Sequence, residues 1–117
     1  MGAAILKLGK KAVENSAFVI NILWYDEAGA SMTPTTANWS LFDSNGSIVN
    51  SLSDVAVTTP ATSNNIVLNA TDTAVISGST NDRRVQVVAS YNSATYGNNL
   101  LLYREIEFGI APLSTVT

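Results

Sequence analysis

The sequence predicts a single all-β domain that folds as a two-sheet β-sandwich of about seven strands. Short stretches of alternating apolar and polar residues follow one another at roughly 8–12-residue spacing, and turn residues separate them. No stretch has the apolar period of an amphipathic helix. A chain of 117 residues also suits one hydrophobic core, because it is too short for two independent ones.

The first half of the chain carries the clearest strand and turn signals. Residues 17–25 alternate strictly and predict a strand, which the turn residues 26–29 end. Residues 36–42 alternate again and predict a second strand. The sequence Asp-Ser-Asn-Gly at 43–46 then leads directly into residues 47–51, which predicts a tight hairpin with the glycine at a positive φ.

Two short strands and an irregular segment are expected next. Val55 and Val57 predict a short strand, and residues 65–69 predict another. Residues 70–79 lose strict alternation. We interpret them as a crossing loop or a single helical turn that sends Val75 or Ile76 inward.

The last third of the chain predicts two long strands. Residues 84–91 and residues 101–110 both alternate, and the polar segment 92–99 is expected to be the loop between them. Residues that share the inward face of the predicted strands form the expected core. They are Phe18, Ile20, Ile22, Trp39, Leu41, Ile66, Leu68, Val85, Val87, Ile106 and Phe108.

We divide the chain into three parts on this basis. The sandwich is expected to span residues 17–112, followed by a short C-terminal tail, residues 113–117. Residues 1–16 precede the first strong strand and form either an N-terminal arm or the first edge strand of the sandwich. The sequence leaves both alternatives open.

Composition excludes several classes of partner. Only 13% of the residues are charged, against a typical value of about 25%, and the formal net charge is −3. This charge is too weak, and of the wrong sign, for nucleic-acid binding. No apolar run approaches the ~20 residues that span a bilayer, so no membrane segment is expected. A surface with few charges resists association weakly, which suits a homo-oligomer or a multi-copy assembly.

The residue types needed for catalysis are scarce. The chain has no Cys and no His, which excludes most nucleophilic triads and the commonest metal ligands. Two carboxylate pairs remain, Asp26 with Glu27 and Glu105 with Glu107, and we interpret both as solvated. Residues 43–46 start like a calcium loop but lack its later ligands. We therefore expect neither an enzyme nor a bound cofactor or metal.

The order of strands and turns resembles a known family. Its most recognisable parts are the first strand Phe-Val-Ile-Asn-Ile, the strand that contains Trp39, the turn at 43–46, and the final pair of strands. This pattern, over about residues 17–110, resembles small immunoglobulin-like or fibronectin-III-like proteins of bacteriophage particles. Trp39 matches the tryptophan that such folds bury, although the cysteine pair of antibody domains is missing.

The resemblance implies a function and a location. Such proteins decorate the phage head as cement proteins, or belong to the tail, neck or baseplate. The resemblance implies that the partners are the major capsid protein or other virion proteins. It also implies synthesis in the host cytoplasm and a final location in the phage particle. A host-surface or glycan-binding adhesion module is the alternative function.

Two regions are candidates for partner contact. The N-terminal segment mixes apolar residues with lysines and has little reason to order alone, so we expect it to add as a strand to a partner or to pair within its own sandwich. Tyr96 is the aromatic residue expected to be free for contact, because it lies in a polar loop. Arg83 and Arg84 are expected to be solvated. The candidate partner-binding residues are Ile5, Leu6, Lys7, Leu8, Lys10, Lys11 and Tyr96.

Overall fold

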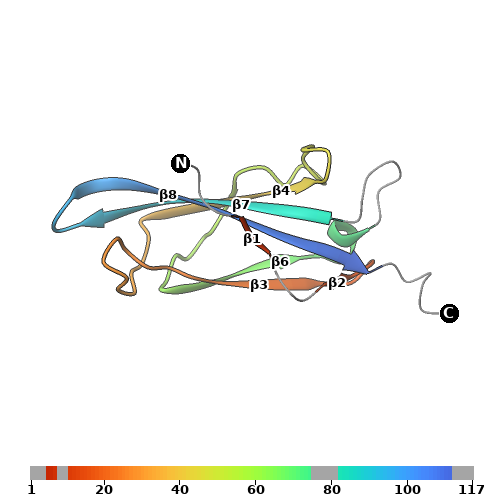
Figure 1. Cartoon of the computed structure of the whole chain (residues 1–117), viewed down its shortest axis with the longest axis horizontal. Coiled ribbons are helices and arrows are strands. Elements are labelled where there is room, and N and C mark those ends of the chain that lie inside the picture. The colour runs from red at the N-terminus through yellow and green to blue at the C-terminus, as the bar shows by residue number, and fades with distance from the viewer. Residues whose placement is uncertain (1–4, 8–10, 75–81, 112–117) are drawn as a thin grey trace.

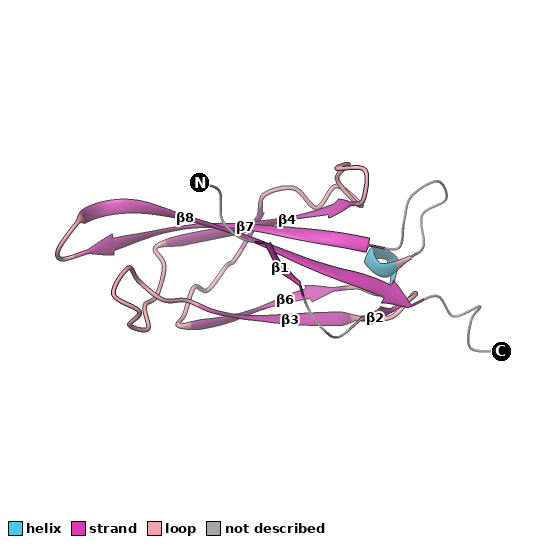
Figure 2. Ribbon diagram, viewed as in Figure 1, coloured by secondary structure: helices cyan, strands magenta, loops and turns pink. Residues whose placement is uncertain are grey.

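The computed structural model describes residues 5–7, 11–74 and 82–111, and it shows a two-sheet β-sandwich with one short 3₁₀ helix (Figures 1 and 2). No helix in these ranges is long and apolar enough to cross a bilayer. In chain order, the elements are β1 (Ile5–Lys7), β2 (Ala12–Val13), β3 (Phe18–Leu23), β4 (Thr36–Asp43), β5 (Val55–Ala56), β6 (Ser63–Leu68), η1 (Ala70–Thr73), β7 (Asp82–Ser93) and β8 (Gly97–Ala111).

The predicted all-β sandwich is confirmed. The larger sheet has the order β1-β8-β7-β4-β5, with β2 also paired to β8, and the smaller sheet consists of β3 and β6. The pairs β4–β7, β7–β8 and β3–β6 are antiparallel. Placing β3 and β6 in one layer and β4, β7 and β8 in the other corresponds to the strand arrangement of immunoglobulin-like folds.

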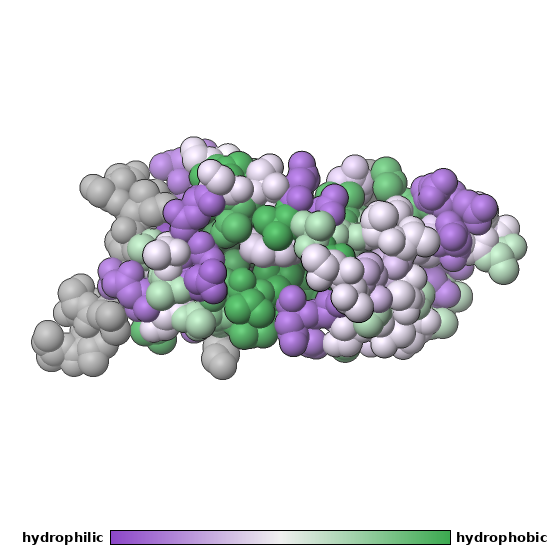
Figure 3. Space-filling view, turned by 180° about the vertical axis from the view of Figure 1, so that it is seen from behind, coloured by the Kyte–Doolittle hydropathy of each residue, from purple (hydrophilic) through white to green (hydrophobic). Residues whose placement is uncertain are grey.

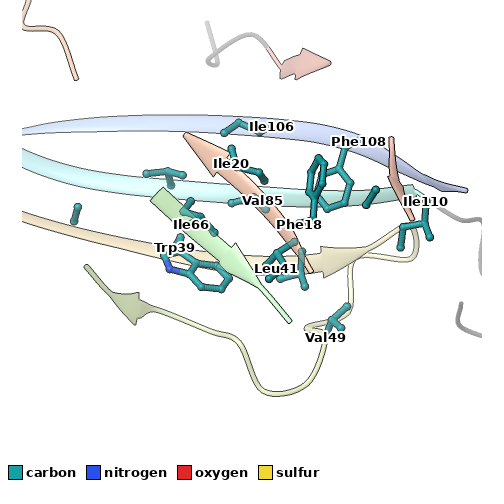
Figure 4. Close-up of a cluster of buried hydrophobic side chains, with 14 of the residues drawn as sticks. Phe18, Ile20, Trp39, Leu41, Val49, Ile66, Val85, Ile106, Phe108 and Ile110 are labelled. Atoms are coloured by element: carbon teal, nitrogen blue, oxygen red, sulfur yellow. The ribbon is translucent and has the colours of Figure 1, made fainter. Parts of the chain in front are cut away.

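The core lies between the two sheets and follows the predicted inward faces. Phe18 of β3 packs on Phe108 of β8 with ring centroids 4.8 Å apart (Figure 4). All the predicted core residues are buried except Ile22, which is partly buried and packs against the cluster. Seen from behind, apolar surface gathers in the middle of the molecule, between more hydrophilic regions (Figure 3).

The Asp-Ser-Asn-Gly turn forms as predicted, but the strand expected at 47–51 does not. Asp43 Oδ1 accepts hydrogen bonds from the N–H groups of Asn45 and Ser47, and Gly46 has φ +82°. Beyond the turn, only an isolated bridge joins Phe42 to Ile48. Asn50 then takes a positive φ of 54°, which bends the chain away from an extended path.

The irregular segment after β6 contains the predicted helical turn. Residues Ala70–Thr73 form η1, and Asp72 Oδ2 accepts a hydrogen bond from Asn69 N at 2.7 Å. Thr73 is fully buried and accepts a hydrogen bond from Ser16 N at 3.0 Å, which ties this turn to the chain before β3. Val75 and Ile76, one of which was expected to point inward, lie outside the described residues.

The hairpin of β7 and β8 is longer than predicted. Both strands extend into residues 92–99, which were expected to be a loop, so that only residues 94–96 separate them. A register irregularity falls between Tyr91 and Ser93. The last pair between β4 and β7 is Thr36 with Ser90. The hairpin extends past this pair, at the left of Figure 1. The molecule is 55 Å long and 25 Å wide.

The N-terminal segment pairs with the last strand. Ile5–Lys7 lie parallel to Glu105–Glu107, and Ala12–Val13 lie parallel to Ile110–Ala111. Ala12 is buried in the core. Of the two alternatives for residues 1–16, this pairing corresponds to the edge strand of the same sandwich. The predicted tail at 113–117 lies outside the described residues.

Candidate surface for partner binding

The outer edge of β8 is covered along only part of its length. β1 and β2 pair with β8 from Glu105 onward. Over residues 97–104 no strand of the described chain pairs with this edge, and β7 occupies only the other side. We call the outer backbone edge of residues 97–104 the free edge. Every second residue of a β-strand points its N–H and C=O to one side, so the free edge offers hydrogen-bonding groups to a partner strand.

Exposed apolar side chains surround the free edge. Leu101 is 62% exposed, Tyr103 is 50% exposed and Tyr96, in the turn, is 67% exposed. Leu101 and Tyr103 point away from the core because they alternate with Leu102, Ile106 and the other inward residues of β8. Arg104 is the only charged residue among positions 97–104. The surface therefore suits contact with another protein more than contact with water.

A hydrogen bond ties the far end of the hairpin to the loop after β3. Tyr91 is buried, and its hydroxyl donates to Glu27 Oε1 at 3.2 Å. Ser93 Oγ donates to Glu27 Oε2 at 3.3 Å. Burial and the hydrogen bond to Glu27 raise the pKa of Tyr91 above its ordinary value. Glu27 therefore holds the projecting hairpin in position.

A groove of about 230 Å³ lies between β3 and β8, where the two sheets separate. Ile22 of β3 and Trp24, which directly follows β3, line one side of the groove. Leu102 and Ile106 of β8 line the other side. Arg104 and Glu105 contribute charges of opposite sign to this lining. The indole of Trp24 is buried and donates to Asn64 Oδ1 at 2.8 Å, so the groove has a fixed wall.

The two carboxylate pairs have separate structural partners. Arg84 forms ion pairs with Glu105 at 3.6 Å and Glu107 at 3.3 Å, and all three side chains are partly exposed. Asp26 Oδ1 accepts hydrogen bonds from the N–H groups of Ala28 and Ala30, which shapes the turn. Among the described residues, no group of three or more acidic side chains could hold a metal ion.

Arg83 is buried, contrary to the expectation that it is solvated. Its side chain is at the end of the core, where the guanidinium donates to the carbonyl oxygens of Ala74 and Asp82. Burial lowers the pKa of Arg83, and the charge of Asp43 partly opposes that shift. The alternation of β7 predicts this inward position, because Arg83 shares a face with Val85 and Val87.

The predicted partner-binding residues do not form one surface. Ile5, Leu6 and Lys7 are in β1, paired with Glu105–Glu107, and Lys11 lies beside Gly109, further along β8. Tyr96 is nine positions before Glu105 on the hairpin, which corresponds to about 30 Å along a strand. Leu8 and Lys10 lie outside the described residues.

Sequence reasoning identified Tyr96 but missed Leu101 and Tyr103. Tyr103 is half exposed. The signal was present: counting back from the inward Ile106 and Phe108 by twos puts Tyr103 and Leu101 on the opposite face. Comparisons with models of known protein families, with curated proteins and with solved structures find no match to this chain.

Proposed function

We propose that this protein is a non-catalytic structural component of a bacteriophage particle, and that it acts as a decoration or cement protein that binds and stabilises the assembled head. The resemblance of residues 17–110 to small sandwich proteins of phage particles motivates this proposal. The two-sheet sandwich fits that family's fold.

The observation that carries the proposal is the outer edge of β8 over residues 97–104, toward the far end of the β7–β8 hairpin. No described strand covers this edge, exposed apolar side chains lie along it, and Arg104 is the one charged residue over positions 97–104. Residues 5–7 and 12–13 are paired with β8, so their backbone already serves the fold. We therefore place the contact with virion proteins on the hairpin end rather than on the N-terminal segment. Many weak contacts of this kind gain avidity on a shell.

The test is to find the protein in purified particles of the phage that encodes it and to map its position. Density for the sandwich on the head supports the proposal. Density in the tail, neck or baseplate would replace the cement role with a role there. Absence of the protein from the particles would overturn the proposal.

A rebinding assay tests the contact surface. Particles produced without the protein are mixed with the purified chain, and the bound fraction is measured after sedimentation. Tyr103→Ser should lower binding, whereas Val67→Ser should not, because Val67 is 53% exposed on β6 of the smaller sheet, against 50% for Tyr103 on β8. Equal binding by the two variants would mean that the hairpin end is not the contact.

The exposed turn of the hairpin favours a second function, binding of a surface glycan. Tyr96 is 67% exposed, and Asn98 and Asn99, which follow it in the chain, are also exposed, so this region offers an aromatic ring and amide groups that can hydrogen-bond to sugar hydroxyls. Binding of the purified chain to host cells, and its loss in Tyr96→Ala, would support this function. Binding to particles alone would exclude it.

A further inference from the structure

The groove between β3 and β8 is bordered on one side by the backbone edge of β3. Five consecutive residues, 21–25, line the groove, and side chains of an extended chain alternate between its two faces. Consecutive residues can therefore all reach one space only along the edge of the strand. β3 pairs only with β6 in the part of the chain that the structure describes. The edge of β3 that borders the groove thus has no partner strand.

The ladder between β3 and β6 determines which backbone groups point to this open edge. Trp24 N donates to Thr62 O at 3.1 Å, so these two residues are a hydrogen-bonded pair of the antiparallel ladder. Successive residues point their N–H and C=O groups to opposite sides of a strand, so those of Asn21 and Leu23 point away from β6. No described group outside the ladder hydrogen-bonds to the backbone of either residue. These groups are spaced to bind another extended backbone.

The side chains in the groove favour an apolar occupant. Ile22 and Leu102 are only partly buried, because the groove leaves one side of each uncovered. The groove volume of about 230 Å³ is below the roughly 300–1,000 Å³ of typical small-molecule sites. An inserted strand would cover both residues with apolar side chains at alternate positions while its backbone pairs with β3.

Arg104 gives the groove one charge that lacks a counter-ion. It lies on the inward side of β8, and one guanidinium N–H donates to Tyr103 O at 2.7 Å. No described carboxylate forms an ion pair with it. Glu105, which also lines the groove, is already paired with Arg84 at 3.6 Å. The remaining N–H groups of Arg104 therefore favour an acidic residue on the inserted strand.

We propose that this groove binds an extended segment of a partner protein, antiparallel to β3, with an acidic residue between two apolar residues on its inward face. That pattern matches Leu102, Arg104 and Ile106, which follow one another at every second position on the opposite wall. Antiparallel pairing is the more stable arrangement per residue. This inference goes beyond the proposed function, because it depends on the edge of β3 and the inward face of β8 and applies to the purified chain alone.

A charge reversal tests the pairing with Arg104. The probe is the end-blocked peptide Thr-Val-Thr-Asp-Thr-Val-Thr, its control has Lys in place of Asp, and NMR shifts of the backbone amides of the purified chain measure binding. The Asp peptide should shift the amides of Ile22 and Leu102 and bind about tenfold more tightly than the Lys peptide. Arg104→Glu should reverse this preference. Lys11→Glu should keep it, because Lys11 lies beside Gly109 and outside the groove.

Three results of this titration would overturn the proposal. They are an absence of shifts at millimolar peptide, shifts confined to other parts of the chain, and a preference for the Asp peptide that persists in Arg104→Glu. The particle-binding assay does not use these peptides, so any of the three results would leave the proposed function standing.

Methylation of the peptide backbone tests the pairing with β3. In an antiparallel pair, the residues bonded to Asn21 and Leu23 share their outward side, so they are the threonines of the peptide. N-methylation of the threonines should abolish binding, whereas N-methylation of the valines and the aspartate should preserve it. Equal binding by the two methylated peptides, or the opposite result, would overturn antiparallel pairing with β3.

Discussion

The two halves of the β7–β8 ladder are both antiparallel but have different surroundings. Near Val85 and Ile106, the ladder is flanked by β4 and β1 and packs against the smaller sheet, so its inward side chains are buried. Near Leu101 and Tyr103, β4 still flanks β7, but no described strand pairs with the outer edge of β8. The inward apolar residues of both halves serve the fold, including Ala89 and Leu102 in the second half. The second half also has Leu101 and Tyr103 exposed on its outward face, where a partner can reach them.

The largest effect expected from this difference is the loss of a core side chain. Trp39 is buried opposite Val87, so Trp39→Ala should lower the free energy of unfolding by about 3–5 kcal/mol. Leu101→Ala, on the exposed half, should change it by no more than about 0.5 kcal/mol in the monomer. Urea unfolding at low protein concentration measures both. Similar losses in the two variants would contradict the distinction.

Removal of the N-terminal strands should have the next largest effect. Deletion of residues 1–12 removes β1 and the buried Ala12, and it uncovers the edge of β8 over the folded half of the ladder. We expect the free energy of unfolding to fall by about 2 kcal/mol. Urea unfolding again provides the measurement. Unchanged stability would show that residues 1–12 act as an arm and contribute nothing to the fold.

A smaller, pH-dependent effect should appear at the hairpin end. The pKa of Tyr91 is raised above its ordinary value of 10.0, so the folded state favours the neutral phenol. The stability from this group is present below about pH 10 and is lost as the pH rises through the raised pKa. The melting temperature should therefore fall more steeply with alkaline pH in the unmodified protein than in Tyr91→Phe. Tyr96→Phe is the control, and a profile identical for all three proteins would contradict the prediction.

The smallest effect should come from the ion pairs on the outer face. Arg84, Glu105 and Glu107 are all partly exposed, so solvent screens their attraction. Glu105→Gln should cost about 0.5 kcal/mol or less, and high salt should remove the difference. Urea unfolding at two ionic strengths tests this. A loss of the size expected for Trp39→Ala would mean that the outer face supports the fold as much as the core does.

Alternation along the strands was sufficient to predict the sandwich and nearly all of its core. It works because each inward residue, such as Leu41 or Val85, is set by the two-residue period of its own strand. The same rule could have placed Arg83 inward and Tyr103 outward. For Arg83, the residue type was given more weight than its position, and the structure shows that position decided the outcome.

The strand ends and the pairing of the N-terminal segment could not be predicted in the same way. Asn98 and Asn99 are typical loop residues, yet they lie within β8, at the register irregularity between the pairs Tyr91–Leu100 and Ser93–Gly97. The pairing of Ile5 with Glu105 joins residues a hundred positions apart, and a local pattern carries no information on such a contact. The candidate surface depends on both features, so only its Tyr96 was identified beforehand.

The parallel pairing of β1 and β2 with β8 has a mechanical consequence. Both strands run in the direction of β8, so opposite forces on the chain before β1 and after β8 pull the paired strands along their length. Their hydrogen bonds then bear the load together in shear, instead of opening one after another as in an unzipping hairpin. In a chain tethered at both ends, this geometry resists a pulling force before the core is disturbed.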